Sequence, residues 1–269
     1  LKISVSNIGL TAYDHSEELF LLGDIGISGL EVAPSRVWPM DQLTNIAGEV
    51  EIYRRQVELA GLRVIGLHSL FYNMPGLGLF KDQPNRSKSL RFLAELSKMC
   101  RDLGGKILTY GGGRQKGSLT SENAKEEALN FFSDLIPMIQ EHGTCFCFEP
   151  LGPEDSDFIN SVYESIWLVE QLNSPWLKVQ LDAKALVQNG EAEITTFRSA
   201  EKYLVHFHAN EPDLGVLGTS GIVNHKRLGQ MLRAIGYQEF VSIEQRLCDE
   251  SDPIRDIAAS ANIIKECYI

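Results

Sequence analysis

Four side chains that can bind a metal ion or transfer a proton each follow a short apolar run of the sequence. Glu149 follows CFCF, Asp182 follows VQL, His208 follows LVHF and Glu244 follows FVSI. Because side chains of a β-strand alternate between its two faces, each of the four shares a face with a small or polar residue two positions earlier. The bulky apolar residues take the other face. If these runs are neighbouring strands, the four groups converge at one end of a sheet.

Three carboxylates held close together repel one another unless a proton or a cation relieves the repulsion. One divalent metal ion is the simplest solution, with Glu149, Asp182, His208 and Glu244 as its ligands and open positions left for a substrate. Carboxylates and an imidazole suit Mn²⁺, Mg²⁺, Co²⁺ or Zn²⁺, and the residue types do not select among these ions. The alternative for each carboxylate taken alone is a solvated charge in the loop after its strand.

The elements that must position these groups alternate between short β-like runs and amphipathic helical stretches. The predicted strands are 2–6, 29–33, 62–68, 106–110, 144–149, 177–182, 203–208 and 240–244, and the predicted helices are 16–22, 41–60, 86–103, 121–141, 162–172, 184–189, 226–235 and 253–266. This alternation in 269 residues predicts a single (β/α)8 TIM barrel, with one domain over residues 1–269. A doubly wound open sheet is the alternative, but the turn after the first strand, SNIGLTAY, lacks a glycine-rich phosphate loop.

The active site of such a barrel lies at the carboxyl ends of its strands. Polar residues at or just after these ends are therefore predicted to line a substrate pocket, and they include Glu31, His68, Tyr110 and Asp155. Each of these residues could instead have a purely structural role. Glu31 could form a buried ion pair, and His68 could be a structural histidine. Tyr110 could be a packing residue, and Asp155 could lie in a solvated loop.

Charge and composition narrow the class of partner. The net charge is −11 and the isoelectric point is near 5.1, so repulsion of polyanions argues against nucleic acid or an anionic membrane as a partner. No apolar run approaches the roughly 20 residues that span a bilayer, and no signal peptide is visible. The 5 cysteines are scattered, which is typical of a reducing compartment. We expect a cytoplasmic protein that acts on a small molecule.

Several stretches, spread in order over nearly the whole chain, carry a family resemblance. They are GLEVAP, GLHSLFYN, FEPLGPEDSDFINS, VQLDAKAL, HFHANEPD and GIVNHKRLGQMLRAIGYQEFVSIEQ. Together they resemble the xylose isomerase-like TIM-barrel superfamily, which includes sugar epimerases and isomerases, inosose-type dehydratases and endonuclease IV repair enzymes. The ketose 3-epimerase branch is the most similar.

The resemblance implies the same ligand set, Glu149, Asp182, His208 and Glu244. It also makes Glu149 and Glu244 an acid–base pair, in which one removes a proton from a sugar carbon and the other returns it from the opposite face. It further implies a metal-bound enediolate, a sugar or polyol substrate and, as is common in the superfamily, a homodimer.

The sequence departs from the ketose 3-epimerases at two places. Those enzymes carry a histidine three residues after the strand-six aspartate, where this chain has Ala185, and an arginine shortly after the strand-seven histidine, where HANEPDLG has none. Both residues normally hold substrate oxygens, and Glu211 and Lys184 are the candidates to replace them. We therefore expect a metal-dependent sugar isomerase or epimerase. The alternatives are a dehydratase of a keto-polyol such as an inosose, and a non-catalytic sugar-binding barrel.

The endonuclease IV branch is disfavoured by missing ligands. Its trinuclear zinc site has possible counterparts here in His68, Glu149, Asp182, His208, His225 and Glu244. The strand-four histidine is replaced in LTYGGGR, however, and Ala185 and Val223 stand at two further ligand positions. A trinuclear site cannot be built from the remaining residues, and the acidic charge opposes a DNA groove.

Overall fold

Eight parallel strands form a closed barrel in the order β1 to β8, and β8 pairs with β1 to close the ring. This computed structural model describes residues 1–40, 43 and 46–269. The strands are β1 (Lys2–Ser6), β2 (Gly29–Val32), β3 (Arg63–Leu67), β4 (Ile107–Tyr110), β5 (Cys145–Phe148), β6 (Leu177–Asp182), β7 (Leu204–Ala209) and β8 (Phe240–Ile243). The predicted (β/α)8 barrel is confirmed, and each predicted strand is present with ends shifted by at most a residue.

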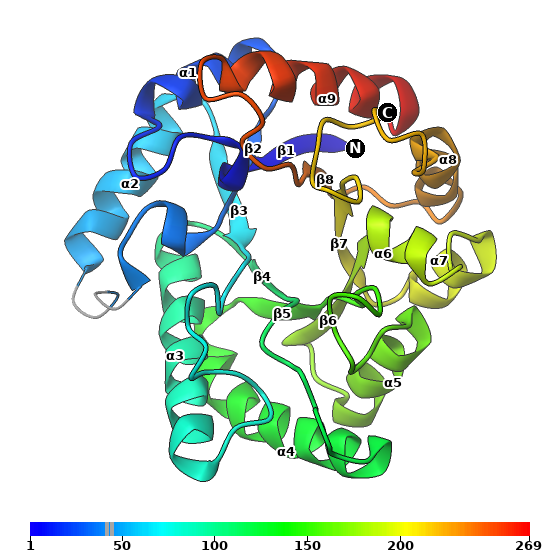
Figure 1. Cartoon of the computed structure of the whole chain (residues 1–269). Helices are drawn as coiled ribbons and strands as arrows, with labels where there is room; N and C mark the ends of the chain where they lie inside the picture. The colour runs from blue at the N-terminus through cyan, green and yellow to red at the C-terminus, as the bar shows by residue number, and fades with distance from the viewer. Residues whose placement is uncertain (41–42, 44–45) are drawn as a thin grey trace.

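Helices follow the strands and surround the barrel (Figure 1). They are α1 (Ser16–Asp24), α2 (Ala47–Leu59), α3 (Gln83–Asp102), α4 (Ser121–Ile139), α5 (Val162–Leu172), α6 (Ala183–Gln188), α7 (Ile194–Ala200), α8 (His225–Ala234) and α9 (Pro253–Cys267). The helix predicted at 41–60 is observed from Ala47, and positions 41, 42, 44 and 45 of that prediction lie outside the described residues.

The helix α7 was not predicted. Its first residues, Ile194, Thr195 and Thr196, are β-branched and have low intrinsic helix propensity. Phe197 and Ala200 on this helix are fully buried. Tertiary packing therefore stabilises a helix that intrinsic propensity does not favour.

Side-chain caps fix where several helices begin. The hydroxyl of Thr120 accepts a hydrogen bond from the Asn123 amide at the start of α4, over 3.2 Å. Ser161 and Glu164 form a reciprocal capping box at the start of α5. These contacts satisfy amide groups that the first helical turn leaves without intrahelical partners. The loops that connect the strand ends to the helices are thereby fixed at the edge of the barrel where the predicted site lies.

The barrel wall separates two kinds of side chain, as the alternation of the strands predicts. Large apolar residues such as Phe148, Leu181 and Phe207 are fully buried on the side of the helices, whereas small and polar residues fill the interior. The strands β3 and β4 approach each other closely in this wall. A Cβ at Gly66 of β3 would lie 2.4 Å from the carbonyl oxygen of Ile107 on β4, so only glycine allows this strand spacing.

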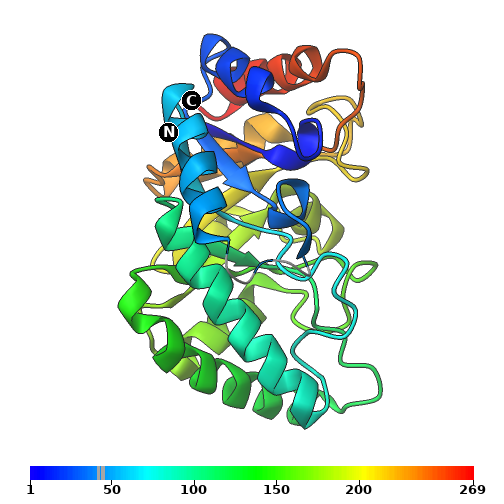
Figure 2. The same cartoon turned by 90° about the vertical axis from the view of Figure 1, so that its left-hand side faces the viewer.

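The two ends of the barrel differ. Figure 2 shows the long loops that follow the strands gathered on one side, and both chain ends on the opposite side. We call the first side the mouth and the second, where the strands begin, the floor. Within the part of the chain that the structure describes, no helix combines the length and apolar character needed to cross a membrane.

Candidate active site at the barrel mouth

The four side chains predicted as metal ligands converge at the mouth. One atom each from Glu149, Asp182, His208 and Glu244 lies within 4.8 Å of the others. They stand at the ends of β5, β6, β7 and β8, where Asp182 pairs with His208 in the strand register. Three of them are buried and Glu244 is nearly so. The four groups, which alternation assigns to the inner faces of their strands, therefore do lie at one height.

The imidazole of His208 faces this cluster with a nitrogen that has no hydrogen-bond partner. Its Nε2 lies 2.9 Å from Oε2 of Glu31, and because an ionised carboxylate can only accept, Nε2 carries the proton. The buried Nδ1 forms no hydrogen bond. It lies 3.3 Å from Oε1 of Glu149 and 3.3 Å from Oε2 of Glu244. Burial would lower the pKa of His208, but Glu31, Glu244 and Glu149 hold it well above its ordinary value, so without a metal ion Nδ1 takes up a proton. A divalent ion would replace that proton among the carboxylates, so these residues fit a divalent metal.

The charge balance of the carboxylates supports the same interpretation. Burial, and then the negative charges of Glu149 and Glu244, raise the pKa of Asp182 to about 8. Burial would also raise the pKa of Glu244, but His208 and His68 hold it well below its ordinary value. Three ionised carboxylates are thus not tolerated here without added positive charge.

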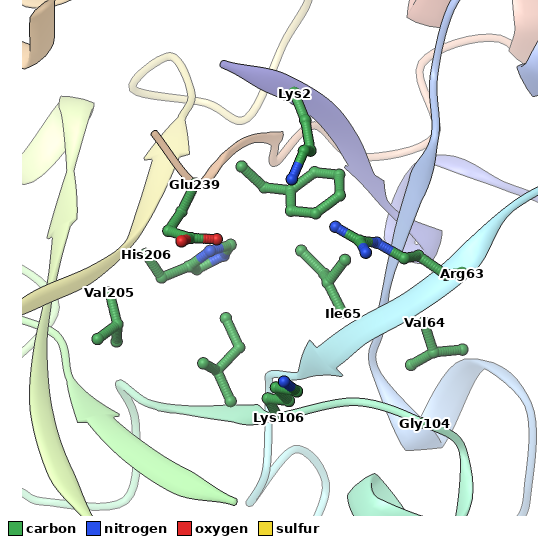
Figure 3. A pocket seen from close by; sticks show the side chains of 11 residues that line it. Lys2, Arg63, Val64, Ile65, Gly104, Lys106, Val205, His206 and Glu239 are labelled. Atoms are coloured by element: carbon green, nitrogen blue, oxygen red, sulfur yellow. The ribbon is translucent and has the colours of Figure 1, made fainter. Parts of the chain in front are cut away.

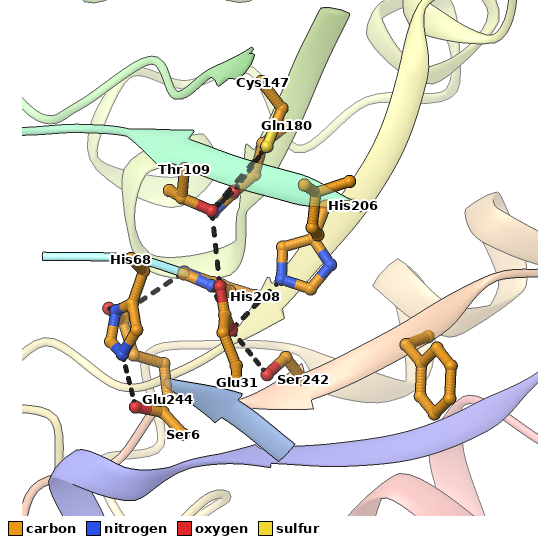
Figure 4. Close-up of polar contacts among 12 residues, drawn as sticks. Ser6, Glu31, His68, Thr109, Cys147, Gln180, His206, His208, Ser242 and Glu244 are labelled. Carbon is orange, nitrogen blue, oxygen red and sulfur yellow. Dashed lines mark hydrogen bonds and ion pairs between the residues drawn. The ribbon is translucent and has the colours of Figure 1, made fainter. Parts of the chain in front are cut away.

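A buried layer of polar groups lies directly beneath the ligands (Figure 4). Oε2 of Glu31 accepts hydrogen bonds from Nε2 of His208 over 2.9 Å, from Oγ of Ser242 over 2.8 Å and from Nε2 of His206 over 3.2 Å. Burial would raise the pKa of Glu31, but His208, His206 and His68 hold it well below its ordinary value. Glu31 therefore does not line the substrate pocket as predicted. It supports His208 from below, as the alternative of a buried ion pair anticipated.

Two amide side chains that the sequence analysis did not assign orient the carboxylates. Asn210 donates through Nδ2 to Oδ2 of Asp182 and, over 2.9 Å, to Oε2 of Glu244. Gln180 donates to Oε1 of Glu149 over 2.8 Å. Both residues could have been predicted from the sequence. Asn210 lies two residues after His208 and Gln180 two residues before Asp182, so each shares the inward face of its neighbouring ligand.

A cavity of about 300 Å³ opens above the cluster. His68 and Asp155, both predicted as substrate-binding residues, line it together with Lys184. Nδ1 of His68 lies 3.5 Å from Oε1 of Glu244, and its Nε2 lies 2.6 Å from Oγ of Ser6. Lys184 pairs with Asp155 over 2.7 Å. Burial alone would lower the pKa of Lys184, but Asp155 and the nearby carboxylates keep it raised, so the amine is charged.

Two predicted site residues lie elsewhere. The ring of Tyr110 stacks on Phe148 at 5.3 Å and meets Phe132 at 5.2 Å, because Thr109 takes the inward face of β4 and Tyr110 the outward one. Tyr110 is a packing residue, as its alternative stated.

Glu211 is fully buried in the loop after β7. Its carboxylate accepts hydrogen bonds from the amide of Gly218, from the hydroxyl of Ser220 and from Nε2 of His225. It holds this loop together and does not line the cavity, so the prediction that it binds substrate is not supported by its position.

A second cavity, of about 560 Å³, adjoins the first. The two share Ser69, Leu214 and Glu244 as lining residues. Arg36 and Tyr72 lie in the wall of the second cavity. The combined volume of the two cavities is within the range of small-molecule binding sites. Glu244, which lines both cavities, belongs to the ligand cluster.

The fold and the ligand cluster define the class of protein. The model of the family described as xylose isomerase-like TIM barrel matches residues 21–267. The chain therefore belongs to the xylose isomerase-like TIM barrel family, as the resemblance predicted.

Individual relatives of known activity have low sequence identity to this chain. A D-psicose 3-epimerase of Ruminiclostridium cellulolyticum is 25% identical over 142 residues, which cover 53% of this chain and 48% of that enzyme. The aligned part thus spans about half the length of this relative.

Solved structures match over nearly the full length. D-psicose 3-epimerase from Clostridium cellulolyticum H10 superposes with a TM-score of 0.82 at 18% identity, covering 100% of this chain and 99% of that one. For 3-keto-D-glucoside 4-epimerase from E. coli the TM-score is 0.83 at 17% identity, with 99% and 100% covered. An L-ribulose 3-epimerase gives 0.81 at 16% identity, with 99% and 94% covered. At these identities the likeness shows a shared fold.

Proposed function

We propose that the protein is a divalent-metal-dependent isomerase or epimerase acting on a sugar or keto-polyol. The observation that carries the proposal is the convergence of ligand atoms from Glu149, Asp182, His208 and Glu244 within 4.8 Å of one another. The relatives add support, because those named above are epimerases of ketoses and of a keto-glucoside.

The four converging side chains would hold the ion, and Mn²⁺, Mg²⁺, Co²⁺ and Zn²⁺ all suit them. A divalent ion at this position supplies positive charge where negative charge develops on the substrate oxygens. The residues of the chain fix where that charge sits. Glu31 orients His208 from below, and Asn210 spans Asp182 and Glu244.

Glu149 and Glu244 are the groups we assign to proton transfer. Epimerisation inverts a carbon next to a carbonyl when its proton leaves from one face and a proton arrives at the other. Glu149 follows β5 and Glu244 follows β8, three strands further around the ring, so a substrate between them presents one face to each. Gln180 and Asn210 hold the two carboxylates in place, which keeps them aligned for transfer.

Lys184 and Asp155 are our candidates for holding substrate hydroxyl groups. Ala185, which stands where the ketose 3-epimerases have a histidine, is buried and offers no polar side-chain atom. The ion pair of Lys184 and Asp155 lies in the wall of the same cavity. It presents both a donor and an acceptor, which suits a neutral polyol better than an anion.

Product analysis tests the proposal. The purified protein, loaded with each of the four ions in turn, is incubated in D2O with a panel of ketoses and inososes. We expect an inverted sugar carrying one solvent deuterium at the inverted carbon. Loss of water would support a dehydratase, and tight binding without deuterium exchange would support a sugar-binding barrel. Either result would overturn the epimerase proposal.

A further inference from the structure

A further cavity, of about 310 Å³, lies at the floor of the barrel, at the end opposite the ligand cluster. It is formed where β1, β3 and β8 begin and just before β4. Figure 3 shows the side chains of Lys2, Arg63 and Lys106 around it, with Glu239 and His206 on another side. We call this space the floor cavity. The proposed reaction makes no use of it.

The floor cavity concentrates positive charge in an otherwise acidic chain. Its lining includes three cationic side chains, Lys2, Arg63 and Lys106, and one carboxylate, Glu239. Nζ of Lys2 lies 5.7 Å and Cζ of Arg63 lies 4.8 Å from the ring centre of Phe240, so the two cations stand against the same ring. Among residues 1–40, 43 and 46–269, no carboxylate forms an ion pair with any of the three. All three side chains are exposed to solvent, so an anion can reach their charged groups.

His206 adds a buried polar group to the wall of the floor cavity. Its side chain is 1% exposed, and its Nε2 lies 3.2 Å from Oε2 of Glu31. Because Nε2 donates to that carboxylate, the other ring nitrogen, Nδ1, is an acceptor in the neutral ring. The neutral ring of His206 therefore offers no donor to an oxyanion, and Lys2, Arg63 and Lys106 are the groups of the floor cavity that would hold one.

We propose that the floor cavity binds a phosphate group, either as inorganic phosphate or as the phosphate of a small monoester. A doubly charged oxyanion complements the three cations in charge, and the planar guanidinium of Arg63 matches two of its oxygens. The volume admits phosphate with a small organic group attached. Because the site lies at the floor, its occupant is distinct from the substrate at the mouth, and the inference does not depend on the proposed function.

Isothermal titration of the metal-loaded protein with inorganic phosphate tests this site, at ionic strength held constant with NaCl. We expect saturable binding of one phosphate per chain. Arg63→Gln and Lys106→Gln should each weaken the affinity by about tenfold or more, the usual loss for a charged hydrogen bond. Lys98→Gln, which removes the same charge from the exposed face of α3, should leave the affinity unchanged. Thermal unfolding of each variant checks that it is folded.

Further measurements separate this site from phosphate bound to the metal and identify the form of the ligand. Protein freed of metal by chelation and dialysis should retain the affinity for phosphate. Tighter binding of a sugar phosphate than of inorganic phosphate would identify a monoester, and equal binding would identify the phosphate group alone. Absence of saturation, dependence on the metal, or equal losses in Lys98→Gln and Arg63→Gln would overturn the proposal.

Discussion

His208 donates its Nε2 proton to Glu31 over 2.9 Å in the fully buried interior of the barrel. The bond joins β7 to β2, so it ties together strands that are far apart in the sequence. Because Nε2 is bonded to Glu31, Nδ1 is the nitrogen that faces the carboxylates at the mouth, where a bound metal ion would replace its proton. Such carboxylate partners set the tautomer, orientation and basicity of metal-binding histidines. Glu31 is therefore a positioning residue for the metal site.

Replacing Glu31 with Gln should weaken metal binding about 10- to 100-fold, the usual range for partners of a metal ligand. The amide no longer fixes the tautomer of His208, because it both donates and accepts. Titration of the metal-free variant against a metal indicator measures the effect. Ser242→Ala is the matched control, since it removes a donor to the same oxygen and leaves the carboxylate–histidine bond in place. Equal affinities for Glu31→Gln and the parent protein would contradict the assigned role.

Replacing Glu149 with Gln should lower kcat/KM by about 10²- to 10⁴-fold and also reduce metal content, because one carboxylate serves as ligand and as proton carrier. Steady-state kinetics on the substrate found in the product panel, with elemental analysis of the same preparation, measures both. Glu154→Gln removes an exposed carboxylate from the following loop and should change neither. Full activity and metal content in Glu149→Gln would refute both assigned roles.

Replacing Lys184 with Gln should raise KM about tenfold while changing kcat little, the pattern expected when an interaction binds ground state and transition state alike. The amine pairs with Asp155 in the wall of the cavity, and the change removes its charge and one donor to the substrate. Asp155→Asn should act in the same direction. A loss confined to kcat would instead place Lys184 in the chemical step.

The stability of the folded chain should fall in mild acid through His15. Burial lowers the pKa of this histidine from 6.5, although its hydrogen bond to the carbonyl of Thr11 acts in the opposite direction. Its Nε2 lies 2.7 Å from the hydroxyl of Tyr53, which suits the neutral ring. The unfolded chain therefore takes up the proton first, and stability present above about pH 6.5 is lost as the pH falls below it.

His15→Gln should reduce this pH dependence. Urea unfolding of the metal-loaded protein at about pH 7.5 and about pH 5.5 measures it. Glu18 and Asp14 favour the charged ring and Arg36 disfavours it, and the substitution leaves all three in place. His142→Gln changes a half-buried histidine in the turn after α4 whose pKa is also lowered by burial; it serves as the comparison and should reduce the pH dependence less than His15→Gln, because His142 is less buried. An identical loss of stability in the parent and His15→Gln would show that other groups cause the acid sensitivity.

Much of the fold could be predicted because its determinants are local. The alternation of short apolar runs with amphipathic helical stretches predicted the strands of the barrel to within a residue of their ends. The helix α7 was missed because its β-branched start has little helical preference, and burial of Phe197 decides its state. Tyr110 was placed at the site because it ends its strand, although its alternation with Thr109 already puts it on the outer face.

The sequence by itself determined which face of each strand carries Glu149, Asp182, His208 and Glu244, since alternation along a strand needs no knowledge of its neighbours. Only the tertiary structure decided the depth of each group inside the barrel. Between β2 and β3 the register shifts at Leu30 and Glu31, and Glu31 lies below the ligands, where it supports His208. Depth depends on how neighbouring strands are staggered around the closed ring, and that stagger is a property of all eight strands together.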